Sequence, residues 1–140
     1  MAEYVYNPIQ EVEDNQNVLL NDSIPCTRGF VVHRNGSGIL TLRGCTNNCF
    51  ARYQVTFNGN IAVPTGETVG EISLALAIDG EPVQTSRARV TPSAVEEYFN
   101  VTSTAFVTVP RGCCYTIAVE NTSGIPIEVQ NSNLVVTRTA

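Results

Sequence analysis

The chain has 140 residues, enough for one domain with a buried core but short for two domains of ordinary size. Its net charge is −5 and it has no basic run, which argues against nucleic acid as a partner. No segment approaches the roughly 20 consecutive apolar residues of a membrane span, so no membrane partner is expected. Hydrophobic residues make up 43% and charged residues 15%, which predicts a folded chain with a weakly charged surface suited to protein contacts.

The first 20 residues are polar and acidic, without usable periodicity. They predict an extended arm (1–20) that becomes ordered only against a partner, followed by one β-domain (21–140). An extended segment can add to the exposed edge of a sheet, so the apolar side chains of the arm are its expected partner contacts. These are Tyr4, Val5, Tyr6 and Ile9. The N-terminus lacks the basic start and apolar core of a secretory signal, so synthesis in a cytosol is expected.

Beyond the arm, short β-rich runs alternate with Gly, Pro, Asn and Asp clusters, a spacing typical of a sandwich or barrel. The expected strands are approximately 26–33, 38–43, 50–63, 70–79, 82–90, 99–109, 113–121 and 125–138, the last broken near Asn131. The clearest is GEISLALAID, in which Ile72, Leu74 and Leu76 share one face. Asp79 and Gly80 then supply the positive φ angles of a tight hairpin turn.

Only the segment TPSAVEEYF, residues 91–99, has helical character. Thr91 could cap a helix, Pro92 suits the first helical position, and Ser93 and Glu96 have the spacing of a capping box. One short helical turn and no helix at all are equally open for this segment.

Five cysteines raise the question of redox chemistry. In a strand over 113–121, Cys113 shares the face of Ile117 and is expected in the core, whereas Cys114 is expected to face the surface or a subunit interface. The loop CTNNC could bring Cys45 and Cys49 within disulfide distance. A cytosolic origin favours free, partly buried thiols instead, and both alternatives stay open.

No residue pattern points to catalysis. The cysteines lack the paired spacing of a zinc site, and the single His33 has no cysteine near it in the sequence. Glu96 and Glu97 are adjacent and diverge, and the NGSG turn at 35–38 lacks the Lys and helix of a phosphate loop. The sequence therefore predicts a protein that is not an enzyme and has no catalytic, cofactor-binding or metal site.

One order of features extends over residues 28–138. It consists of an aromatic strand with Tyr53, the Asp79-Gly80 hairpin, the approach Val107-x-Val109-x-x-Gly112, a turn from Asn121 to Ser123, and a last strand with Leu134, Val136 and Arg138. This order resembles the TNF/complement-type (globular-head) jelly-roll family, of the kind found in phage and bacterial structural proteins. The resemblance implies an antiparallel ten-strand sandwich that forms a tight homotrimer. The residues expected in the core or along the trimer axis are Tyr53, Phe57, Leu74, Leu76, Phe106, Tyr115 and Ile117.

The function that the resemblance implies is structural. No collagen-like stem precedes the domain and no signal follows Met1, which favours a component of a phage or prophage particle. We expect a trimeric capsid (head) decoration protein, attached through its arm to the major capsid protein or another virion protein. It would be made in the host cytoplasm and reside in the virion. The alternative is a trimeric receptor- or glycan-binding knob of a phage tail fibre or of a fibre on the bacterial cell surface.

Overall fold

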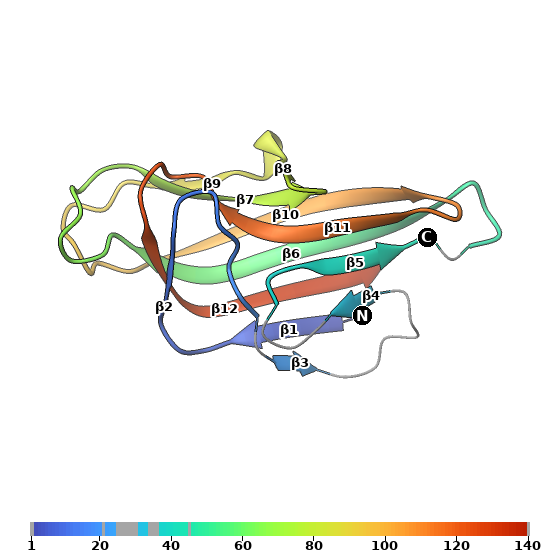
Figure 1. Ribbon diagram of the computed structural model, residues 1–140, viewed down its shortest axis with the longest axis horizontal. Helices are drawn as coiled ribbons and strands as arrows, with labels where there is room; N and C mark the ends of the chain where they lie inside the picture. Colours follow the sequence, from blue (N-terminus) through green and yellow to red (C-terminus); the bar gives the residue numbers. More distant parts are fainter. Residues whose placement is uncertain (1, 21, 25–30, 34–36, 45, 140) are drawn as a thin grey trace.

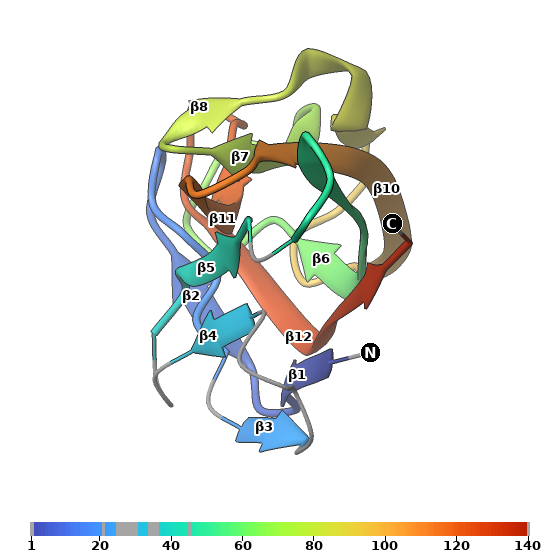
Figure 2. The same cartoon turned by 90° about the vertical axis from the view of Figure 1, so that its right-hand side faces the viewer.

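The computed structural model describes residues 2–20, 22–24, 31–33, 37–44 and 46–139. They form two antiparallel sheets of six strands each, packed face to face (Figures 1 and 2). The long-strand sheet has the order β10 (Phe99–Pro110), β6 (Phe50–Ala62), β12 (Ile127–Arg138), β1 (Ala2–Tyr6) and β3 (Asp22–Ile24), with β2 (Gln10–Val12) beside β12. The short-strand sheet has the order β4 (Val31–His33), β5 (Leu40–Arg43), β11 (Cys114–Asn121), β7 (Ile72–Ile78) and β8 (Glu81–Pro82), with β9 (Ala88–Val90) beside β7. The all-β jelly-roll expectation is confirmed.

Alternation along the strands places the core between the two sheets. On β7, Ile72, Leu74 and Leu76 are almost completely buried, as their shared face predicts. The turn that follows has φ angles of 51° at Asp79 and 85° at Gly80, which confirms the predicted hairpin. The predicted break in the last strand is confirmed as well, because the pairing of β12 with β6 shifts register between Gln130 and Asn133.

The residues expected in the core or along the trimer axis divide into two groups. Five are buried in the core, namely Tyr53, Phe57, Leu74, Leu76 and Ile117. The hydroxyl of Tyr53 donates a hydrogen bond of 2.6 Å to the carbonyl of Arg43, which satisfies its polar atom inside the core. Tyr115 is half-buried against the core, whereas Phe106 is 53% exposed on the opposite side of its sheet.

The expectation of a separate N-terminal arm is wrong, because residues 2–20 belong to the sandwich. Strand β1 lies between β12 and β3, with Ala2 opposite Val136, and β2 also pairs with β12. The chain then crosses to the short-strand sheet, where the N–H of Val18 donates to the carbonyl of Val119. Tyr4 is only 3% exposed, so the domain has no boundary at residue 20.

The expected partner contacts of the arm are therefore distributed differently. Tyr4 is part of the core, Val5 and Tyr6 are half-buried, and only Ile9, at 52% exposure, remains fully available to a partner. The pairing of β1 could not be read locally, since its partner β12 lies more than a hundred residues further along the chain.

One further expectation needs correction, since the strand expected over 82–90 is divided into β8, a 3-10 turn (Gln84–Ser86) and β9. Of the two alternatives left open for the segment 91–99, the structure has the one without a helix. Glu96 has a φ angle of 58°, which a right-handed helical turn does not allow. Among the described residues, no helix is long and apolar enough to cross a membrane. The expected strand 26–33 is described only at its end, by β4.

Candidate functional site

The long-strand sheet has an outer face that points away from the short-strand sheet. It is formed by alternate side chains of four strands, which are Arg52, Gln54, Thr56, Asn58 and Asn60 on β6, Asn100, Thr102, Thr104, Phe106 and Thr108 on β10, Glu128, Gln130, Asn133, Val135 and Thr137 on β12, and Glu3 and Val5 on β1. We call this set the outer face. Most of its members are uncharged and polar, so it resembles neither a protein core nor an ordinary charged surface.

Cross-strand hydrogen bonds order the middle of the outer face. Asn100 donates to Asn60 at 3.2 Å and Thr102 donates to Asn58 at 3.1 Å. The next rung joins the hydroxyls of Thr104 and Thr56 at 3.2 Å. Each such pair contributes about 0.2–1 kcal/mol and holds its side chains in one arrangement. The result is a flat surface whose polar groups are already partly satisfied within the protomer.

Phe106 follows this ladder on β10. Its ring is 53% exposed, the largest exposure among the large hydrophobic side chains of the described residues. The guanidinium of Arg52 lies over the ring at 4.5 Å from its centroid, a cation–π contact. Aromatic and Arg side chains are both enriched at protein–protein interfaces, so this pair marks Phe106 as a candidate interface residue.

A second surface lies where the loop before β6 meets the turn between β10 and β11. The N–H of Arg111 donates to the carbonyl of Cys49 at 3.0 Å, and the N–H of Gly112 donates to the carbonyl of Gly44 at 3.1 Å. The N–H of Gly44 in return donates to the carbonyl of Cys113 at 2.8 Å. The turn is therefore held on both sides by the loop.

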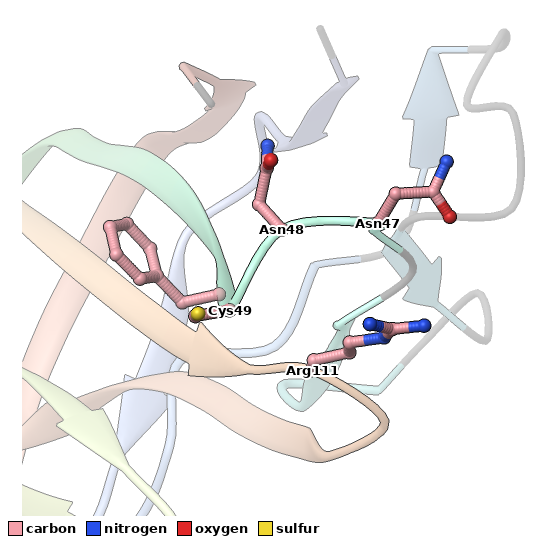
Figure 3. A pocket seen from close by; sticks show the side chains of 5 residues that line it. Asn47, Asn48, Cys49 and Arg111 are labelled. Atoms are coloured by element: carbon pink, nitrogen blue, oxygen red, sulfur yellow. The ribbon is translucent and has the colours of Figure 1, made fainter.

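Beside this junction is an open hollow of about 630 Å³, lined by Asn47, Asn48, Cys49, Phe50 and Arg111 (Figure 3). Phe50 is 44% exposed, so its ring is accessible to a bound molecule. No local pattern in the sequence marks this hollow. Its signal was indirect, because the loop NN at 47–48 and the turn RG at 111–112 become neighbours only through the pairing of β6 with β10.

The cysteines differ from the expectation in one respect. Cys113 is exposed and not in the core, because it lies in the turn and β11 begins only at Cys114, so strand parity does not apply to it. Cys114 is exposed, as expected, and Cys49 is an exposed free thiol. A free Cys49 agrees with the alternative of unbridged thiols and not with a bridge to Cys45, which itself lies outside the described residues.

The opposite end of the sandwich carries a group of acidic side chains. The hydroxyl of Tyr98 donates to Glu128 at 2.6 Å, and Glu96 accepts hydrogen bonds from the N–H and the hydroxyl of Thr65. Burial raises the pKa of Glu128. A hydrogen bond with Glu128, and then one with Thr65, lowers the pKa of Glu96. The pKa of Tyr98 is raised by burial and by its bond to Glu128.

The single histidine makes contacts that hold the fold together. One ring nitrogen of His33 is 2.8 Å from the carbonyl oxygen of Ser37, and its ring lies 4.6 Å from that of Tyr4. Within the described ranges, no group of three or more His, Cys, Asp or Glu side chains could hold a metal ion.

Comparison with solved structures identifies the fold. The globular domain of zebrafish complement 1qA aligns with a TM-score of 0.64 and 16% identity, over 96% of this chain and 94% of that chain. The chain has the TNF/complement-type jelly-roll fold. Eiger TNF from S. frugiperda aligns at 0.67 with 12% identity, over 100% and 92% of the two chains, and murine APRIL at pH 8.5 aligns at 0.58 with 9% identity, over 93% and 98%. No family model and no curated protein matches the sequence of this jelly-roll chain.

Proposed function

We propose that this jelly-roll chain is a non-enzymatic binding and structural protein that assembles as a homotrimer through its outer face. The observation that carries the proposal is Phe106, 53% exposed beside a ladder of uncharged, hydrogen-bonded Asn and Thr side chains. The cross-strand bonds reduce what this surface loses on desolvation, because six of its amides and hydroxyls already bond one another, and the surface gains from burial of the ring.

The position of β10 at the edge of its sheet also supports assembly through the outer face. β10 has 12 residues and is an edge strand of the long-strand sheet. Its one proline is its last residue. Long edge strands without Lys or internal Pro usually need a covering partner. A neighbouring copy that covers β10 would bury the edge and Phe106 together.

Within this function, we propose a role in a phage-like particle as a trimeric capsid decoration protein, located in the virion. The support is the low proportion of charged residues, 15%, which suits a surface packed against other proteins. Attachment through a free arm is not part of the proposal, since β1 is a strand of the sandwich. A folded surface must make the contact with the major capsid protein.

The alternative is a trimeric receptor- or glycan-binding knob. The hollow beside Arg111 favours it, because it lies at one end of the sandwich among loops, where recognition sites commonly occur. Co-sedimentation separates the two roles. A decoration protein binds purified particles that lack it and ignores host cells, whereas a knob binds cells.

The trimer itself is tested by light scattering on the purified chain. We expect the mass of three protomers at micromolar concentration. A monomer at that concentration would refute the assembly, and with it both particle roles.

A further inference from the structure

The end of the sandwich that holds the hollow is basic within an acidic chain. Segments 37–62, 99–119 and 129–139 include the loop and the turn of this end, continue along the strands toward the other end, and contain no Asp or Glu. Four of the eight basic residues of the chain lie here, Arg43, Arg52, Arg111 and Arg138. Asp79, in a neighbouring turn, is engaged by the N–H and the hydroxyl of Thr116. The local field therefore favours an anion although the net charge is −5.

Four backbone N–H groups around the hollow are already engaged within the protein. The N–H groups of Arg111, Gly112 and Cys113 all donate to carbonyls of the loop or of the turn itself, and the N–H of Asn48 donates to the hydroxyl of Thr46. These four groups therefore do not form the nest of backbone donors that surrounds a ligand in the usual kind of phosphate site. The argument for a ligand rests on the side chains.

The side chains of the hollow provide three kinds of contact. Arg111 offers a planar guanidinium that can bind a carboxylate through two parallel hydrogen bonds. Asn47 and Asn48 carry carboxamides that can both donate to and accept from hydroxyl groups. The exposed ring of Phe50 offers a flat apolar surface. Figure 3 shows the amides and the guanidinium projecting from the facing loop and turn.

We propose that this hollow binds a carboxylated sugar, of the uronic or sialic acid class. Arg111 binds the carboxylate, the two Asn carboxamides bind ring hydroxyls, and Phe50 packs on the C–H face of the ring. The volume of about 630 Å³ accommodates a terminal sugar unit of a longer chain. This inference deepens the glycan-binding alternative, on whose site it rests, but it does not depend on the trimer, because each protomer carries the hollow whether or not it assembles.

Other anions match the hollow less well. A phosphate would leave the amides and the apolar ring of Phe50 unused. An acidic peptide would add its backbone to a sheet edge, whereas loop residues form most of this lining. Both remain as outcomes of the test that would overturn the proposal.

The first experiment compares ligands that differ only in the carboxylate. Methyl β-glucuronide and the methyl glycoside of N-acetylneuraminic acid are titrated into ¹⁵N-labelled protein, and methyl β-glucoside is the neutral match for the glucuronide. We expect at least one acidic sugar to shift the Asn47 and Asn48 side-chain signals and to bind at least about tenfold more tightly than the glucoside.

The same titration on variants tests whether Arg111 is the residue that binds the carboxylate. Arg111→Gln should weaken binding at least about tenfold. Arg89→Gln should leave it unchanged, since Arg89 pairs with Glu71 away from the hollow. The proposal is overturned if neither acidic sugar binds, if the glucoside binds equally, or if Arg111→Gln has no effect. Tighter binding of inorganic phosphate or of N-acetyl-aspartate amide would overturn it too.

A second readout uses the thiol in the lining. A saturating acidic sugar should slow alkylation of Cys49 severalfold, while Cys113 and Cys114, exposed outside the lining, react at unchanged rates. Equal protection of all three cysteines, or none, would contradict binding in the hollow. Because both readouts are independent of oligomeric mass, their failure leaves the proposed trimer untouched.

Discussion

Phe106 offers the sharpest test of how the chain assembles, through the variant Phe106→Ala. The ring is 53% exposed in the protomer, so truncation removes little from the folded protomer itself. A Phe side chain can bury about 150–250 Å². About half of that area is still open, and its burial against a neighbour contributes roughly 2–3 kcal/mol per protomer at about 25 cal/mol per Å².

Three copies make the effect large. The variant should weaken a trimer by about 6–9 kcal/mol in total. The concentration at which half the chains are trimeric varies with the square root of the trimer dissociation constant. It should therefore rise roughly 100-fold or more.

The assay is sedimentation equilibrium over a concentration series, with circular dichroism to show that the variant protomer is folded. The matched control is Val32→Ala, since Val32 is 51% exposed but lies on the short-strand sheet. The control should dissociate at the same concentration as the unchanged chain. If Phe106→Ala also dissociates at that concentration, the outer face does not carry the interface.

Three further changes test the protomer. Asn121→Ala should destabilise it by about 3 kcal/mol or more in urea unfolding, because the buried carboxamide bonds three backbone groups that would lose their partner; an unchanged midpoint would contradict this. Burial, with Glu81 and Asp14 nearby, raises the pKa of Glu120 in the fold, so its contribution is greatest below its unfolded pKa and is lost as pH rises through the folded pKa. Glu120→Gln should therefore raise the melting temperature at pH 7 more than at pH 4, and an equal change at both would refute the assignment. Gly44→Ala should lower stability by about 1–3 kcal/mol, since a Cβ would clash with the carbonyl oxygen of Pro110, and a normal melting temperature would show that the turn can move.

Local patterns predicted the strands whose signals lie within a few residues. The alternation of β7, the Asp79-Gly80 turn and the break at Asn131 needed only side-chain period and turn chemistry, and all three are present. The same local patterns gave a wrong prediction for the segment after β8, which was expected to continue as one strand to residue 90. Its bend depends on Ser86, whose buried hydroxyl bonds the carbonyl of Val83 and accepts from the N–H of Leu76 across the sheet.

Long-range pairing was the part that the sequence could not reveal. Tyr4 was predicted to be a partner contact, because a short acidic segment does not indicate which distant strand it will pair with. The hollow was missed for a related reason, since Asn48 and Arg111 are some sixty positions apart in the sequence and meet only once β6 and β10 are in register. Phe106 was expected in the core or along the trimer axis, and parity within β10 places it on the outer face, so only the second of these positions stays a prediction.

The pairing of β1 with β12 makes the two ends of the fold neighbours, with Ala2 opposite Val136 (Figure 1). A linker of a few residues could therefore close the chain into a ring without disturbing either sheet. The exposed Asp79-Gly80 turn would then serve as new termini, as in a circular permutant. In such a chain β1 would follow β12 directly, and β7 would be made last. The same sandwich would then fold with its longest-range strand contact converted into a local hairpin.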